Sequence, residues 1–191
     1  MPLMISPFAI SDLSSLINTI NDIYYLALIR SNNTADALLE LSDLLRYVLQ
    51  EKEQRVELKK EIEHLQRFVK LNHFRFPESS VDLQIDISEN AETLEIAPLM
   101  LISFTENAFK HGEQGTEEEP VRISLSVAGS TLSYKVVNVV GEKTSKDKSN
   151  GIGLTNLKKR LELMYPGQFT MSAEKKGNHF IAKLDILLTK I

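Results

Sequence analysis

The sequence predicts an α+β protein, in which a helical N-terminal region precedes a sandwich of helices on one face of a mixed sheet. Two observations lead to this prediction. Apolar residues recur at helical spacing up to Phe76, and beyond Pro77 they alternate with polar residues instead. We therefore expect a helical region over residues 1–77 and a sandwich domain over residues 78–191.

Composition supports a globular chain and excludes several classes. The 191 residues are 42% hydrophobic and 25% charged, close to the averages of soluble domains. The sequence has no cysteine, which excludes disulfides and thiolate chemistry. A net charge of −4 gives no basic excess for nucleic acid, so no direct nucleic-acid partner is expected. No apolar run approaches the ~20 residues of a membrane span. We expect a cytoplasmic chain. The alternative is the soluble part of a longer membrane protein.

Two amphipathic helices are predicted in the N-terminal region. One apolar stripe covers residues 10–24 and another covers residues 38–48, with turn-forming Ser31-Asn32-Asn33-Thr34 between them. Such a short connection predicts an antiparallel hairpin. One hairpin has too little core of its own, so we expect a homodimer in which two hairpins form a four-helix bundle. A third helix is predicted over residues 56–74.

The sandwich domain is predicted from alternation and turn signals. Residues 81–87 alternate as a strand with one wet face, and Ala97-Pro98 opens a helix that Gly112 ends. The remaining predicted elements are strands 121–127 and 132–136 with a turn at Gly129-Ser130, a helix over 154–164, and a hairpin of strands 169–173 and 180–188.

The helix before Gly112 ends in Glu-Asn-Ala-Phe-Lys-His. Asn107 and Lys110 share a face at a spacing of three, as do Glu106 and Lys110 at a spacing of four. This surface offers a carboxylate, an amide oxygen for a hard cation, and cations for phosphate. The alternative is an ordinary polar helix end whose cationic last turn faces the negative end of the helix dipole.

Two further segments are candidates for nucleotide contacts. Gly151-Ile152-Gly153-Leu154 opens a helix, where backbone amides can approach an anion; a plain loop-to-helix turn is the alternative. Asn138 ends a strand, where its amide could bind the edge of a base, although asparagine commonly ends strands.

The order and spacing of these segments resemble the ATP-binding domain of the GHKL superfamily, with its Bergerat-type sandwich. The resemblance implies that Asn107 binds Mg²⁺ and that Glu106 orients or activates the acceptor, so that Glu106 and Asn107 are catalytic. It implies ATP contacts from a larger set: Asn107, Lys110, His111, Asn138, Gly151, Gly153 and Leu154. Asn138 stands where an aspartate is common, which removes the charge-assisted part of an adenine contact.

The N-terminal half is similar to the LytS-type sensor histidine kinases. The similarity lies in Leu-Ser-Asp-Leu-Leu-Arg-Tyr at 41–47, Val-Glu-Leu at 56–58 with Glu61, and Arg75-Phe76. Membership implies a dimeric ATP-dependent kinase that phosphorylates a histidine on its own hairpin. The phosphoryl group then passes to an aspartate of a response regulator.

The acceptor histidine of that family is missing here. Aligning Asn18-Thr19-Ile20-Asn21 with the end of the family's phosphoacceptor motif puts Ser14 at the histidine position. A serine phosphoester is a poor donor to aspartate, so Ser14 is not a functional substitute for the relay. Without the acceptor histidine, we do not expect autophosphorylation within the chain. His64 and His73 match no acceptor box of this family, and we expect them to be packed or solvated. Two functions remain: an ATP-binding kinase acting on a partner kinase or response regulator, or a non-catalytic pseudokinase that acts as a dimeric regulatory module.

Overall fold

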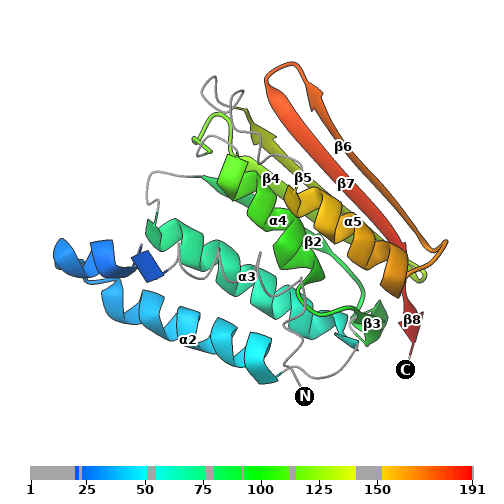
Figure 1. Ribbon diagram of the computed structural model, residues 1–191, viewed down its shortest axis with the longest axis horizontal. Coiled ribbons are helices and arrows are strands. Elements are labelled where there is room, and N and C mark those ends of the chain that lie inside the picture. Colours follow the sequence, from blue (N-terminus) through cyan, green and yellow to red (C-terminus); the bar gives the residue numbers. More distant parts are fainter. Residues whose placement is uncertain are drawn as a thin grey trace.

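A mixed sheet covered on one face by helices forms the body of the protein (Figure 1). The computed structural model describes residues 20–21, 23–50, 55–75, 80–91, 93–111, 115–140 and 152–190. Its elements follow in the order α2 (Thr34–Gln50), β1 (Val56–Glu57), α3 (Leu58–Arg75), β2 (Val81–Asp86), the 3₁₀ turn Glu89–Ala91, β3 (Leu94–Ile96), α4 (Met100–His111), β4 (Val121–Ala128), β5 (Thr131–Val139), α5 (Ile152–Met164), β6 (Phe169–Lys176), β7 (His179–Leu187) and β8 (Thr189–Lys190). The α+β prediction is confirmed.

The large sheet has five strands in the order β2-β4-β5-β7-β6. β2 runs parallel to β4, and every other neighbouring pair is antiparallel. Tight turns join β4 to β5 and β6 to β7, each with a glycine at a left-handed φ, 63° at Gly129 and 61° at Gly177. A second sheet of three short strands, β1-β3-β8, lies beside it.

The parallel pair begins at a close backbone contact that only glycine permits. Ser80 donates its N–H to the Gly115 carbonyl at 2.7 Å, and its own carbonyl accepts from Val121 at 3.0 Å. A Cβ on Gly115 would lie 2.3 Å from the Ser80 oxygen and 2.5 Å from the Val121 nitrogen. Gly115 therefore lets β2 enter the sheet next to β4.

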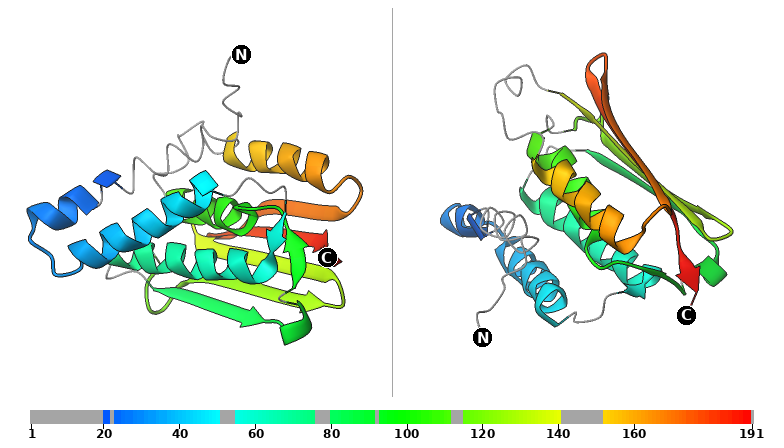
Figure 2. Two further views of the ribbon diagram at one scale, coloured as in Figure 1. Left: turned by 90° about the horizontal axis from the view of Figure 1, so that it is seen from below. Right: turned by 45° about the vertical axis from the view of Figure 1, so that its right-hand side comes forward.

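The main core lies between the sheet and the layer formed by α3, α4 and α5 (Figure 2). Inward-facing strand residues alternate with exposed ones, as their sequence spacing predicts. The largest fully buried side chains include Leu58, Leu65, Met100, Phe104, Ile123, Leu125, Tyr134 and Tyr165.

Helix α3 belongs to this main core. Leu58, Ile62 and Leu65 pack in the same cluster as the strands of the large sheet. The predicted boundary between residues 77 and 78 falls outside the described residues, and the core continues on its N-terminal side. The division at that point stays a prediction.

Helix α2 forms an outer layer on α3 with a small core of its own. The buried side chains of this small core are Ile23, Leu26, Ala37, Leu41 and Leu71. The predicted turn between the first helices is confirmed: Thr34 donates its hydroxyl to the Ser31 carbonyl at 2.8 Å. Residues 1–19, which hold most of the first predicted stripe, lie outside the described part of the chain.

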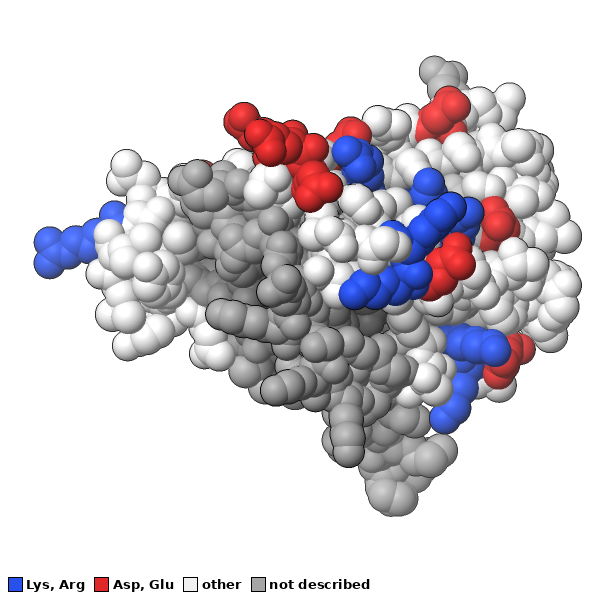
Figure 3. All heavy atoms as spheres, turned by 90° about the horizontal axis from the view of Figure 1, so that it is seen from above, with Lys and Arg blue, Asp and Glu red and all other residues white. Residues whose placement is uncertain are grey.

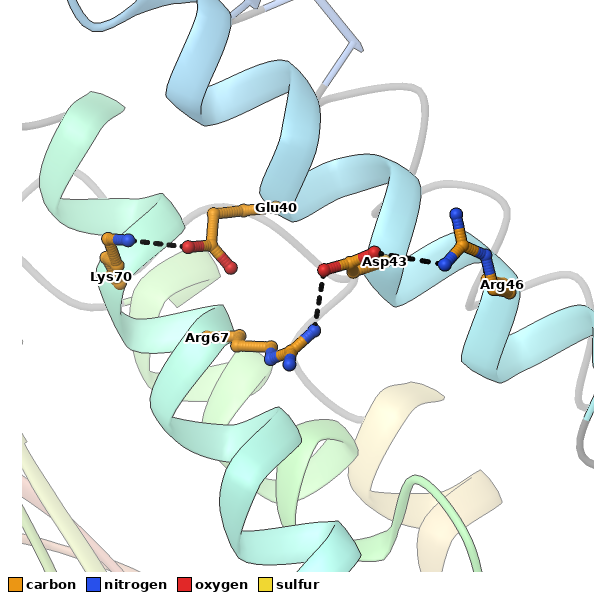
Figure 4. Close-up of polar contacts among 5 residues, drawn as sticks. All are labelled: Glu40, Asp43, Arg46, Arg67 and Lys70. Carbon is orange, nitrogen blue, oxygen red and sulfur yellow. Dashed lines mark hydrogen bonds and ion pairs between the residues drawn. The ribbon is translucent and has the colours of Figure 1, made fainter.

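Charge pairs also join α2 to α3 (Figure 4). Lys70 contacts Glu40 at 2.6 Å, and Arg67 contacts Asp43 at 2.8 Å. Asp43 also lies 3.5 Å from Arg46 on its own helix. Because these side chains are largely or partly exposed, we expect the pairs to contribute little to stability.

Several predicted boundaries are wrong by a few residues. Val56 begins the short strand β1 rather than the third helix, and β3 and β8 were not predicted at all. The helix expected to open at Ala97-Pro98 begins at Met100, because residues 98–99 form a turn instead. The physical reason is a set of side-chain contacts to that turn, described next.

Candidate functional site

The segments predicted to bind nucleotide meet at one end of the sandwich. Figures 1 and 2 show that α4 ends, β5 ends and α5 begins at this same end. Helix α4 packs against both β5 and α5. The fold therefore brings the Glu106–His111 segment close to the strand that carries Asn138 and to the helix that follows Gly151.

Contacts in the middle of α4 fix it on the sheet. The ring of Phe104 meets Tyr134 edge-to-face, with centroids 5.7 Å apart. Thr105 donates its hydroxyl to the Leu101 carbonyl at 2.9 Å and is hydrogen-bonded to the Tyr134 hydroxyl. Burial raises the pKa of Tyr134 far above its ordinary value, so its hydroxyl stays protonated. Glu106 is the next residue along the helix.

The turn before α4 is held by side chains from α3. Glu61 is fully buried, and its two carboxylate oxygens accept the backbone N–H groups of Leu99 at 2.5 Å and Leu101 at 3.2 Å. Leu99 has a φ of 59°, a left-handed conformation that costs a branched residue of order 1–3 kcal/mol.

Two side chains from the other side hold the same turn: Arg160 on α5 and Tyr165, the residue that follows α5. Tyr165 accepts the Ala97 N–H at 2.6 Å through its hydroxyl oxygen, and Arg160 donates to the Pro98 carbonyl. Burial raises the pKa of Tyr165. Sequence reasoning named Glu61 only as part of a family motif, and it missed the contacts of Glu61, Arg160 and Tyr165, since their partners lie tens of residues away along the chain.

At its far end, α4 contacts α3. Phe109 meets Phe68 edge-to-face with ring centroids 5.9 Å apart. Contacts at the start, the middle and the end thus hold α4 along its whole length.

The predicted site residues differ in how far the structure describes them. Glu106 is half-buried, whereas Asn107, Lys110 and His111 are placed in α4 by their backbone and their side chains lie outside the described part. Gly153 lies in the first turn of α5, and Leu154 is partly buried against the main core. Gly151 and Ser14 lie outside the described residues.

Asn138 is buried on the inner face of β5, 3% exposed. Its amide nitrogen donates to the Val139 carbonyl at 3.1 Å, which uses one of its two N–H groups. A buried amide at a strand end retains donor and acceptor capacity for the edge of a base.

The donor types at this end of α4 fit a magnesium nucleotide. A carboxylate at Glu106 and an amide at Asn107 supply the oxygen ligands that Mg²⁺ prefers, and Mg²⁺ commonly takes few protein ligands with phosphate oxygens completing its shell. Lys110 and His111 add groups that can meet phosphate.

Two histidines, His64 and His73, lie on α3. His64 is half-buried and close to α2, and burial, followed by the Arg67 charge, lowers its pKa to about 4. It is therefore neutral near pH 7. His73 is exposed.

Acidic and basic side chains are interspersed over the described part of the face seen from above (Figure 3). No single-sign surface covers it. None of the described helices is both long and apolar enough to cross a bilayer.

Known proteins resemble this chain in sequence and in fold. Residues 15–80 match the family model for histidine kinase. Sensor protein kinase HptS of Staphylococcus aureus is 31% identical over 141 residues, which cover 74% of this chain and 25% of the relative. The match thus spans about a quarter of that relative's length. Ser14 lies one residue before the family match.

Solved histidine kinase structures share the fold. The histidine kinase domain of the blue-light activated kinase from Erythrobacter litoralis aligns with a TM-score of 0.51 at 16% identity, covering 92% of this chain and 96% of that one. The catalytic domain of histidine kinase ThkA, in a nucleotide-free form, aligns with a TM-score of 0.51 at 15% identity, covering 70% and 97%.

The fold is thus that of the catalytic GHKL domains of histidine kinases. Together with the family match and the sequence similarity to HptS, it shows that this chain belongs to the histidine kinase family.

Proposed function

We propose that this chain is an ATP-binding kinase unit of a LytS-type sensor histidine kinase that lacks its own acceptor histidine. The observation that carries the proposal is the meeting of α4, β5 and the start of α5 at one end of the sandwich. The three sequence segments that we assign to nucleotide binding are far apart along the chain, and the elements that carry them lie at this end, which supports the proposal.

Each residue has a proposed role. Asn107 would hold Mg²⁺, Lys110 and His111 would meet phosphate oxygens, and Glu106 would orient the acceptor. Magnesium, when bound, neutralises charge on the transferring phosphoryl group. Asn138 would accept from or donate to the adenine edge.

The glycine turn at 151–153, with Leu154 behind it, would lie against the phosphates through backbone amides. α5 begins at Ile152, so the amides of Ile152 and Gly153 belong to a helix N-terminus, which favours negative charge.

Ser14 in place of histidine leaves the chain without an acceptor of its own. The phosphoryl group would therefore pass to a partner, either a partner kinase or a response regulator. Neither His64 nor His73 is a suitable substitute. His64 is half-buried next to α2, and His73 lies on the same helix without an acceptor motif around it.

We also propose a homodimer through the N-terminal helices. Large apolar side chains are exposed on the residues before α2 and on α2 itself: Ile20, Tyr24, Tyr25, Leu28, Ile29, Leu38 and Leu39. This concentration of apolar surface is typical of a protein interface.

Calorimetric titration with Mg-ATP tests the proposal directly. The unchanged protein should bind, and Asn107→Ala should lose the magnesium-dependent part of the affinity while its circular dichroism is unchanged. Asn32→Ala, in the exposed turn before α2, is the matched control and should bind as the unchanged protein does.

A failure of the unchanged protein to bind ATP would contradict the kinase proposal and favour the second candidate, a pseudokinase acting as a dimeric regulatory module. Serine at position 14, where the motif alignment expects histidine, favours this candidate. If ATP does bind, incubation with labelled ATP should yield no acid-labile phosphohistidine on this chain. A phosphohistidine mapped to His64 or His73 would contradict the acceptor assignment.

A further inference from the structure

Helix α4 lacks a capping residue of its own. Leu99 precedes Met100 at the N-cap position, where serine, threonine, aspartate or asparagine would normally accept the first free backbone N–H groups. Leucine has no acceptor. Glu61 supplies one from α3 instead, and each of its two oxygens accepts one N–H group at the start of α4.

Glu61 is also unusual in its burial. It is the only buried carboxylate among the residues that the structure describes. A buried carboxylate is costly unless hydrogen bonds compensate it, and the positive end of a helix dipole lowers that cost further. The carboxylate of Glu61 lies against the start of α4, where it receives two hydrogen bonds and faces the positive end of the helix dipole. The burial of Glu61 and the capping of α4 therefore depend on each other.

The conformation of Leu99 adds a second dependence. At a φ of 59°, this residue takes a backbone conformation that leucine rarely adopts. Its N–H is held by Glu61 at 2.5 Å. Without that acceptor we expect Leu99 to return to an ordinary conformation, which would change the direction in which the chain enters α4.

We propose that Glu61 is a positioning residue of the nucleotide site: by holding the amides of Leu99 and Leu101 it fixes how the chain enters α4 and thereby the rotation of that helix. Glu106 and Asn107 lie on that helix, one to two turns beyond the held amides. This inference rests on the proposed function, since it assigns to Glu61 the placement of the residues that would meet Mg-ATP.

The first test needs no nucleotide. Amide hydrogen exchange is measured for Glu61→Gln, with Glu63→Gln as the matched control on the exposed face of the same helix. Glutamine has almost the same shape, but its NH₂ group would face one of the two N–H donors. We expect exchange at the amides of α4 to rise at least tenfold in Glu61→Gln and to stay unchanged in Glu63→Gln.

The second test uses nucleotide. Affinity for ATP is measured by calorimetry with Mg²⁺ and with EDTA. In Glu61→Gln we expect the gain in affinity from magnesium to fall about tenfold, since lost hydrogen bonds to a charged group have effects of this order. In EDTA the affinity for ATP would depend on Asn138 and the start of α5, and we expect it to change less than twofold. If Glu61 had a merely structural role, the substitution would weaken ATP binding equally with Mg²⁺ and with EDTA.

The outcomes separate the two proposals. Absence of ATP binding by the unchanged protein overturns the proposed function. Equal exchange of α4 in Glu61→Gln and Glu63→Gln overturns the positioning role, even if ATP binds. If Glu61→Gln does not fold, Glu61→Asp keeps the charge on a shorter side chain that can reach only one of the two amides. It should show the same local rise in exchange to a smaller extent, and no rise would overturn the inference.

Discussion

Arg55 shows how a single side chain can join distant parts of this fold. Its guanidinium donates to the Met164 carbonyl at the end of α5 at 3.1 Å and to the Thr189 hydroxyl on β8 at 3.4 Å. The same group lies over the ring of Tyr165, 4.8 Å from its centroid. The end of α5 is therefore tied both to the small sheet and to the turn before α4, which Tyr165 contacts through its hydroxyl.

His64 makes a pH-dependent contribution at the residue scale. Its folded pKa is about 4, against 6.5 for the ordinary side chain, because of burial and of the positive charges of Arg67 and Lys60, with Asp43 acting in the opposite direction. Above pH 6.5 the imidazole is neutral in both folded and unfolded protein. As pH falls from 6.5 towards 4, the unfolded chain takes up a proton that the folded protein does not.

We therefore predict that the free energy of unfolding decreases between pH 6.5 and 4 because of this residue. Since His64 is only half-buried, we expect an effect of about 1–2 kcal/mol rather than the full value of the shift. Urea unfolding at pH 7 and pH 4.5 should show a smaller decrease for His64→Gln than for the unchanged protein. The control His73→Gln, on an exposed position, should follow the unchanged protein. An identical decrease in all three proteins would contradict the prediction.

At the scale of elements, α2 depends on a small core that is separate from the main one. Leu41 is 4% exposed in that cluster, whereas Leu39, on the same helix, is 62% exposed. Replacing a buried leucine by alanine lowers the free energy of unfolding by about 2–5 kcal/mol, whereas replacing an exposed one changes it little.

We predict that Leu41→Ala loosens α2 without unfolding the sandwich. Amide exchange should rise across α2, while the strands of the large sheet keep their protection. The matched control Leu39→Ala should leave both unchanged. A rise spread equally over the sheet would show that the two cores are one cooperative unit.

The elements also show what the sequence can and cannot predict. Strands β2, β4 and β5 are long enough for a period of two to be visible, and the predicted turn at Gly129-Ser130 is present. Strands β1 and β8 have two residues each and β3 has three, too few for any periodicity. They form because residues distant in sequence meet, as Val56 does with Ile96.

The candidate site shows the same limit. The Glu106–His111 segment is predicted as the end of a helix from its own residues, and the structure confirms that helix. The groups that hold it are not predictable in this way. The sequence marks Glu61 as part of a family motif, but its contacts to the start of α4 become visible only when α3 and α4 are packed together.

At the scale of the whole molecule, the exposed apolar residues around α2 predict an assembly. Leu28, in the helical residues before α2, and Leu163, on α5, are both largely exposed. A charge at the proposed interface should be costly to bury, whereas a charge on α5 should remain in water.

We expect light scattering after size exclusion to give the mass of a dimer at micromolar concentration. Leu28→Glu should shift the protein towards monomer, and Leu163→Glu should not. A monomer for the unchanged protein would contradict the dimer.

The small sheet has a consequence for how the protein folds during synthesis. Strand β8, at Thr189–Lys190, pairs with β3, which in turn pairs with β1 at Val56–Glu57. The hairpins β4–β5 and β6–β7 join neighbouring segments and can form as soon as they leave the ribosome, whereas this sheet needs both early and late residues. Residues 56–96 therefore leave the ribosome long before their last partner strand has been made, and the small sheet can be completed only after residue 190 has emerged.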